Sequence, residues 1–357
     1  MDEFPWLDNK KSGFLSAFDY FWNDWAVWQK NLVVVICGSA ASWMIQNIVR
    51  NKGGLHNRIT QRIRVEPFNL YETAAFLQSK YVNLNRYEIL KIYMVTGGIP
   101  EYLNNVQVGD SPDQTIDRLC FSKDGALRNE FKELYQALFG KADKHIAIIR
   151  ALADKLSGLS RNEIIDICGF KSGGTVTKVL EELLESGFIS EFIPFNKNTK
   201  DAIFKLTDEY SLFYLKFMEN NKSKGTGTWQ TQATGQAWKS WVGLAFENIC
   251  LKHIEQIKKG LGIWGIYCEP STWRYVPKAG EDGAQIDLLI DRQDNCINLC
   301  EIKFYNDEFE LTKKDMENLK TKRRVFLHPI SPRHKMREVT GSCRRGKFFA
   351  GKPFFVG

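Results

Sequence analysis

Hydrophobic positions at the start of the chain predict one amphipathic helix and one buried strand. Ser12 is a suitable N-cap for a helix that runs to about Gln29. The apolar face of this helix carries six aromatic side chains: Phe14, Phe18, Phe21, Trp22, Trp25 and Trp28. The uninterrupted, largely β-branched run at residues 32–37 is typical of a strand covered on both faces, as in a parallel α/β sheet. With a helix through Trp43 and Ile48, it forms half of a doubly wound domain.

The next stretch, from Glu66 to about Gly140, has the 3.6-residue period of amphipathic helices. Residues 73–81 and 87–95 fit this period best. The Gly-Gly-Ile-Pro sequence at 97–100 separates them from a further helix that begins at Glu101. We therefore expect a helical unit over residues 67–140.

Residues 141–218 combine three helices with a hairpin, in the order of a winged-helix domain. The helices are expected at 143–156, from Ser160 onward, and at 175–185. Glu163 completes a capping box with Ser160. Two apolar runs, 188–193 and 202–206, flank a polar loop and predict the hairpin.

Beyond residue 218 the composition changes twice. Residues 219–235 are rich in Gly, Thr, Ser and Gln and predict a linker. A helix is then expected at about 238–258, strands at 286–291 and 297–304, and a helix around 311–319.

The net charge of +7 is carried by the end of the chain alone. The last 38 residues, from Lys320, hold 11 basic side chains and one acid, so the rest of the 357-residue chain carries −3. The total charge therefore does not by itself indicate a basic protein that binds nucleic acid, because the charge has to be considered domain by domain. The length predicts two or three domains, and 43% apolar with 25% charged residues is a globular composition.

No pattern of a membrane or secreted protein is present. The longest apolar run, at 32–41, is far shorter than the roughly 18 residues that a membrane span needs. The chain does not open on a basic segment, an apolar core and a cleavage site. The eight cysteines form no C-x-x-C pairs. We therefore expect a cytoplasmic protein with reduced thiols and no membrane partner.

The most informative chemistry lies in the hairpin expected around Asp294. Asp287 and Glu301 are equally far from that turn, so they stand directly opposite one another, with Cβ atoms about 5 Å apart. Lys303 follows Glu301 by two positions and shares its face. Two carboxylates at this distance repel unless a divalent cation lies between them, and oxygen ligands suit Mg²⁺. With a lysine to stabilise charge on a phosphate, the set predicts metal-assisted hydrolysis of a phosphodiester.

At these residues the chain resembles the restriction-endonuclease-like, PD-(D/E)xK superfamily. The resemblance implies a mixed sheet flanked by helices, with Asp287, Glu301 and Lys303 in the site. It also implies that Glu247, on an earlier helix, completes the site. The proline of the motif is absent, because Ile286 precedes Asp287. Two other interpretations stay open: an exposed hairpin with ordinary surface charges, and a fold of this kind that does not cleave DNA.

A second resemblance covers residues 1 to about 320. Four segments, 2–8, 37–40, 53–58 and 97–103, are similar in order to AAA+-type P-loop ATPases of archaea and bacteria that carry a C-terminal DUF234 domain. It implies that Asp2 and Glu3 are the acidic pair that binds Mg²⁺ and activates water. It also implies that Ser39 is a polar sensor and Arg58 an arginine finger acting on a neighbouring subunit. ATP, and self-association through the ATPase module, are implied with them.

The ATPase resemblance lacks one essential part. A P-loop has the pattern G-x-x-x-x-G-K-[ST], which holds phosphates, and none precedes Asp2. The similar stretch at 341–348 has Phe348 in place of the Mg²⁺-binding Ser or Thr, and Pro353 follows it closely. We therefore expect a chain truncated at its N-terminus that does not bind ATP tightly. For Asp2 and Glu3, an exposed chain end without function is the alternative.

The resemblance stops after Lys322. Residues 323–357 show no sustained period and are predicted to be non-native sequence or, alternatively, a basic arm that binds nucleic acid. DNA is also a candidate partner of the winged helix. The side chains suited to it lie at the start of the third helix and in the wing: Thr177, Lys178, Lys197 and Lys200. Because the domain is neutral, its packing on neighbouring domains is slightly favoured over contact with DNA.

Together these patterns predict a multidomain protein of the α/β and α+β classes. The expected order is a partial P-loop ATPase core (1–66), a helical lid (67–140), a winged helix (141–218), a linker (219–235), a nuclease-like domain (236–322) and a basic tail (323–357). The expected function is Mg²⁺-dependent hydrolysis of DNA by a domain formerly driven by an ATPase module. The alternative is a non-catalytic remnant, or a nucleotide-dependent regulator, that binds DNA or a partner.

Overall fold

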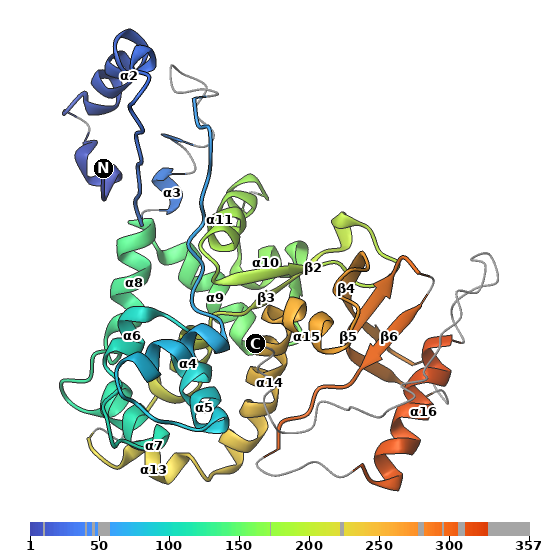
Figure 1. Cartoon of the computed structure of the whole chain (residues 1–357). Coiled ribbons are helices and arrows are strands. Elements are labelled where there is room, and N and C mark those ends of the chain that lie inside the picture. The colour runs from blue at the N-terminus through green and yellow to red at the C-terminus, as the bar shows by residue number, and fades with distance from the viewer. Residues whose placement is uncertain are drawn as a thin grey trace.

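The chain folds into helices and two three-stranded antiparallel sheets (Figure 1). The computed structural model describes residues 1–9, 11–39, 41–44, 47–48, 58–171, 173–221, 225–277, 282–294, 296–305 and 311–327. The predictions for residues 53–57 and for 328–357 lie outside the described residues.

The N-terminal segment stands beside α8 (Glu130–Phe139) and α11 (Gly173–Glu185) at one end of the molecule (Figure 1). It contains α1 (Phe4–Leu7), α2 (Phe14–Asp24), the 3-10 helix η1 (Ala26–Trp28) and α3 (Ala41–Met44). The predicted aromatic helix is therefore present as α2. Its N-cap, however, is Gly13 in the left-handed conformation rather than Ser12, and it ends at Asp24.

The prediction of a strand at 32–37 is wrong, because no strand is assigned to these described residues. The segment is nevertheless extended and runs parallel to the chain start. The Met1 ammonium donates to the Val35 carbonyl at 2.7 Å, and the Cys37 amide donates to the Met1 carbonyl at 3.1 Å. Val34 and Ile36 pack against the small core around Phe4. Val33 and Val35 are 84% and 66% exposed, so only one face is covered.

The helical unit forms as predicted. Its elements are α4 (Leu70–Ser79), α5 (Arg86–Thr96), α6 (Pro100–Asn104), α7 (Pro112–Ile116), the π-helix η3 (Asp117–Phe121) and α8 (Glu130–Phe139). The break between α5 and α6 depends on glycine. Gly98 has φ +74°, and a Cβ there would lie 2.0 Å from the Phe68 carbonyl oxygen.

Residues 143–218 contain the predicted helices and hairpin. The elements are α9 (Asp143–Asp154), β1 (Leu159–Ser160), α10 (Arg161–Cys168), α11 (Gly173–Glu185), β2 (Ile189–Phe192), the 3-10 helix η4 (Thr199–Asp201), β3 (Ile203–Leu206), α12 (Glu209–Phe213) and the π-helix η5 (Tyr214–Met218). The strands lie in the order β1-β3-β2. The capping box of Ser160 and Glu163 is confirmed.

The expectation of a linker is corrected at its second half. Residues 228–232 form α13 (Thr228–Gln232), and Trp229 on this helix is fully buried. Its ring lies 5.1 Å from those of Phe213 and Trp238. The polar composition of the segment is real, but one large aromatic side chain, buried among others, fixes the segment in the core.

The C-terminal part places a sheet between helices (Figure 1). Its elements are α14 (Gln236–Lys252), α15 (Ile254–Gly260), β4 (Cys268–Tyr275), β5 (Ala284–Arg292), β6 (Ile297–Cys300) and α16 (Lys313–Leu327). The single helix expected at 238–258 is thus two helices that meet at His253. The sheet order is β4-β5-β6, and all described pairings are antiparallel, so the implied mixed sheet is not seen in this part. Helix α16 continues through residue 322 to Leu327.

One core joins most of these parts. It runs from Leu70 in α4 to Ile249 in α14 and crosses the expected boundaries after residues 140, 218 and 235. The loop between β2 and β3 packs on the C-terminal sheet: the Phe195 amide donates to the Thr272 carbonyl at 3.3 Å, and the Phe195 ring lies 5.5 Å from that of Phe326. Among the described helices, none combines the length and apolar content needed to cross a bilayer.

Candidate active site

Asp287 and Glu301 lie opposite one another at the end of the β5–β6 pair. The β5–β6 ladder pairs Leu288 with Cys300, and the same register carried one step further pairs Asp287 with Glu301. Strand β6 ends at Cys300, so Glu301 and Lys303 follow the strand instead of lying on it, which corrects the sequence-based prediction. The reason is local. The Asp287 carboxylate accepts the Ile302 amide at 2.9 Å and replaces the backbone partner that a longer strand would use.

Glu301 is held by two lysines. Lys303 Nζ lies 2.8 Å from Glu301 Oε1, which confirms that these two side chains meet. Lys322, on α16, forms an ion pair and hydrogen bond with Glu301 Oε2. The Glu301 side chain is only 11% exposed, so its charge is compensated inside the protein rather than by water.

Glu247, on α14, faces the same group of charges. Burial raises its pKa, Lys205 opposes that rise, and the charges of Asp287 and Glu301 add to it. Lys205, on β3, lies 3.5 Å from Glu247 Oε1. Burial also raises the pKa of Asp287; the amide hydrogen bond from Ile302 lowers it, and the Glu301 charge raises it again. The structure thus gathers Glu247, Asp287, Glu301 and Lys303 into one site.

Lys205 and Lys322 belong to this site and were missed by the sequence analysis. Lys205 comes from a strand more than forty residues before Glu247, and Lys322 from a helix beyond Glu301. No local pattern links either lysine to the carboxylates. Only the packing of β3 on α14, and of α16 on β5, brings them together.

Asp287 and Glu301 carry the oxygen donors that could hold a divalent cation such as Mg²⁺. In the described part of the chain, no group of three or more His, Cys, Asp and Glu side chains is arranged to hold a metal ion. Mg²⁺ does not require one, because it keeps several waters and binds through one or two carboxylates. Burial is the main cause of the raised pKa of Asp287, and the Glu301 charge adds to it.

The residues of the implied ATPase site are partly brought together. The Cys37 thiol lies 2.9 Å from Asp2 Oδ1, and this hydrogen bond lowers the pKa of Asp2. The Ser39 hydroxyl lies 3.4 Å from Glu3 Oε2. Arg58 is exposed, and among the described contacts none joins it to these residues. The chain start pairs with the end of the extended segment at 32–37, but residues 2–3 form a turn, with Glu3 at φ 45°, and α1 follows at once.

The residues suggested for DNA lie on the surface of the unit at 143–206. Thr177 accepts a hydrogen bond from Arg161 at 3.1 Å and donates one to the Gly173 carbonyl at 3.0 Å. Lys178 is exposed and lies 3.9 Å from Glu182. Lys197 and Lys200 are exposed in the loop between β2 and β3.

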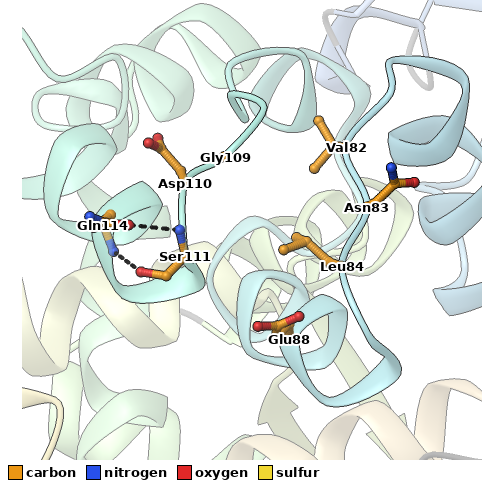
Figure 2. A pocket seen from close by; sticks show the side chains of 8 residues that line it. All are labelled: Val82, Asn83, Leu84, Glu88, Gly109, Asp110, Ser111 and Gln114. Atoms are coloured by element: carbon orange, nitrogen blue, oxygen red, sulfur yellow. Dashed lines mark hydrogen bonds between the residues drawn. The ribbon is translucent and has the colours of Figure 1, made fainter.

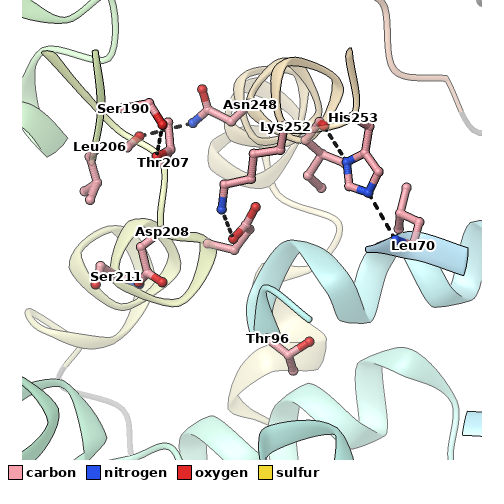
Figure 3. A network of polar contacts seen from close by, with 12 residues as sticks. Leu70, Thr96, Ser190, Leu206, Thr207, Asp208, Ser211, Asn248, Lys252 and His253 are labelled. Atoms are coloured by element: carbon pink, nitrogen blue, oxygen red, sulfur yellow. Dashed lines mark hydrogen bonds and ion pairs between the residues drawn. The ribbon is translucent and has the colours of Figure 1, made fainter. Parts of the chain in front are cut away.

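A network of polar contacts joins α14 to α4, α12 and β3 (Figure 3). The Leu70 amide at the start of α4 donates to His253 Nε2 at 3.0 Å, and Lys252 donates to Glu209 at 2.7 Å. The Asn248 amide donates to the Leu206 carbonyl at 3.3 Å. These bonds fix α14 against α4, α12 and β3, so they hold Glu247 in place. His253 therefore has a structural part, since it joins the end of α14 to the start of α4.

The cavity in Figure 2 does not bring together carboxylates and lysines as the carboxylate cluster does. It has a volume of about 280 Å³ and lies between the chain at 82–88 and the chain at 109–114. Of its two charged groups, Asp110 is paired with Arg118 at 2.8 Å and Glu88 accepts the Asn85 amide at 2.8 Å. Ser111 and Gln114 satisfy one another in a capping box. The carboxylate cluster is therefore the better candidate.

The comparisons with known proteins add one likeness. No family model and no curated protein matches the chain. Among solved structures, the chain is similar to the Walker-type ATPase of Pyrococcus abyssi, with 19% sequence identity and a TM-score of 0.41. The match covers 60% of this chain and 61% of that one, so the chain spans less than two thirds of the ATPase. A likeness at this level identifies no activity.

Proposed function

We propose that this protein is a Mg²⁺-dependent phosphodiesterase that cleaves DNA at a restriction-endonuclease-like site. The observation that carries the proposal is the meeting of Asp287, Glu301 and Lys303 at the end of the β5–β6 pair. Glu247 reaches the same charges from α14. Around these residues, the helices α14 and α15 are followed by three strands and by α16. This order of elements supports a nuclease-like domain at 236–322.

Each residue has a role that follows from its place. Asp287 and Glu301 would hold Mg²⁺, which supplies an activated water and polarises the phosphate. Lys303 is the most exposed lysine of the cluster, at 44%, so it can reach a phosphate and stabilise the charge that develops there. Glu247 is the third carboxylate of the cluster, beside Asp287 and Glu301. It is paired with Lys205, and it adds negative charge to the proposed cation site.

The remaining parts fit a protein related to the DUF234-containing AAA+ ATPases. The parallel pairing of residues 1–4 with 35–37 supports an ATPase-derived core at 1–66. Three helices and the β1-β3-β2 sheet support a winged helix at 141–218. We assign no tight ATP binding to this core. In the winged helix, docking of its hairpin loop on the C-terminal sheet supports an intramolecular role.

A second candidate function is a non-cleaving domain that binds DNA or a partner. It is favoured by the two lysines on Glu301, because both carboxylate oxygens already have a positive partner.

Plasmid cleavage separates the two candidates. The full chain is incubated with supercoiled DNA and Mg²⁺, with EDTA as the blank. Wild type is expected to nick the plasmid, whereas Asp287→Ala and Glu301→Ala should lose at least about 100-fold in rate, because several kcal/mol of transition-state stabilisation are removed. Asp294→Ala, in the turn of the same hairpin, is the matched control and should cleave normally. Wild type without Mg²⁺-dependent cleavage would support the second candidate instead.

A further inference from the structure

Lys322 lies at the carboxylate oxygen that a cation bound to Glu301 would use. Glu301 Oε1 forms an ion pair with Lys303, and Glu301 Oε2 forms an ion pair with Lys322. Both oxygens of this candidate metal ligand are therefore already paired with an ammonium group. A Mg²⁺ ion bound at the same oxygen would lie close to the ammonium, and because both are cations their repulsion weakens the binding of each.

Packing of α16 fixes Lys322 in this place. Phe326, one helical turn further on, is fully buried, and its ring lies 5.1 Å from Trp273 and 5.5 Å from Phe195. Residues four apart on a helix share a face, so the burial of Phe326 turns Lys322 toward the sheet. The Lys322 side chain is 16% exposed, whereas that of Lys303 is 44% exposed.

The charges of the cluster balance without a metal ion. Three carboxylates, those of Glu247, Asp287 and Glu301, face the ammonium groups of Lys205, Lys303 and Lys322. Lys205 contacts Glu247, and Lys303 is exposed enough to turn toward solvent or a phosphate. Lys322 is the one of the three that is both poorly exposed and bound to a candidate metal ligand.

We propose that Lys322 competes with the divalent cation for Glu301 and thereby sets the affinity of the site for Mg²⁺. The inference rests on the proposed function, since it takes Asp287 and Glu301 as the cation ligands. Lys322 holds the empty site neutral, and the cation binds by displacing the ammonium from Glu301 Oε2. The affinity of the wild-type site is lower by the free energy of the ion pair that has to be broken.

The test is calorimetric titration of the full chain with Mg²⁺ alone, without DNA. Lys322→Met should bind Mg²⁺ about 10-fold or more tightly than wild type, because a hydrogen bond between charged groups no longer competes. Lys320→Met is the matched control on the same helix, where the side chain is exposed, and should match wild type. Lys322→Arg keeps the positive charge and should not gain affinity.

The outcomes separate this inference from the proposed function. A gain in affinity cannot result from misfolding, which would weaken binding, so it supports the competition. If wild type binds Mg²⁺, Asp287→Asn removes the binding, and Lys322→Met binds equally or less tightly, the competition is refuted while the metal site stands. If neither wild type nor Lys322→Met binds Mg²⁺, the metal site itself is refuted, and the competition with it.

Discussion

Replacing Asp117 with asparagine removes one hydrogen bond from the buried start of α13 and leaves the side-chain volume almost unchanged. Asp117 is 2% exposed. Its Oδ2 accepts the Gly227 amide at 2.6 Å, and its Oδ1 accepts the Trp229 amide at 2.7 Å. A carboxylate on η3 thus caps a helix that follows more than one hundred residues later. Without this cap, the two amides at the start of α13 would be buried without a partner.

The expected cost is about 3 kcal/mol in the free energy of unfolding. Asparagine has one carbonyl oxygen, so only one of the two amides keeps its acceptor, and the side-chain NH₂ faces the other. A hydrogen bond to a charged group contributes roughly 1.5–3 kcal/mol, and a buried donor without an acceptor costs about 1–3 kcal/mol. The two free-energy ranges describe the same lost hydrogen bond, so they are not added. Because Asp117 is almost fully buried, the upper part of either range applies.

Urea unfolding followed by far-ultraviolet circular dichroism measures this cost, and amide hydrogen exchange at Gly227 and Trp229 localises it. In Asp117→Asn, exchange should rise well before global unfolding at the one of these two amides that loses its acceptor. Asp124→Asn is the matched control, because Asp124 is exposed near the same helix, and it should stay within about 0.5 kcal/mol of wild type. An Asp117→Asn protein as stable as wild type would refute the assignment of α13 to the core.

Further outcomes follow from the capping box of α10 and from the ATPase-like segment. Ser160→Ala should cost about 1 kcal/mol in urea unfolding, because the hydroxyl caps the Glu163 amide; an unchanged midpoint would contradict this role. The Lys155 ammonium and the Ser160 groups lower the pKa of Glu163 from 4.5 to about 2. The stability from Glu163 is therefore complete above about pH 4.5 and is lost as the pH falls toward 2, and unfolding curves of Glu163→Gln should lack this acid dependence. Calorimetry with ATP should show no micromolar binding, since no G-x-x-x-x-G-K-[ST] stretch is present; a micromolar Kd would overturn that expectation.

The sequence contains the information for the centre of the candidate site. The turn near Asp294 sets the register of β5 and β6. Each strand has only two faces, so this register alone places Asp287 opposite Glu301 without knowledge of distant residues. Capping boxes are equally local, which is why the one at Ser160 could be located. In contrast, Lys205 and Lys322 reach the site through tertiary packing, which no periodicity encodes.

The wrong predictions also result from tertiary packing that the local sequence pattern does not encode. Residues 225–235 have the composition of a linker, but burial is decided by Trp229 and its aromatic neighbours and not by the average polarity of the segment. Strand β4 was missed because Pro270 and polar residues hide its alternation, and because its pairing with β5 shifts register between Ser271 and Trp273. The run at 32–37 has the apolar content of a central strand, yet Val33 and Val35 face solvent in this chain.

The contacts between β3 and α14 couple the carboxylate cluster thermodynamically to the β1-β3-β2 sheet. Lys205 pairs with Glu247, and Asn248 binds the Leu206 carbonyl, so a shift of β3 changes the charge beside the cation ligands directly. A ligand that binds this sheet and draws β3 away from α14 would change the affinity for Mg²⁺. Linkage requires that Mg²⁺ change the affinity for that ligand by the same factor. If the proposed cation site binds Mg²⁺, the ion pair and hydrogen bond between β3 and α14 would link that binding to the position of the β1-β3-β2 sheet.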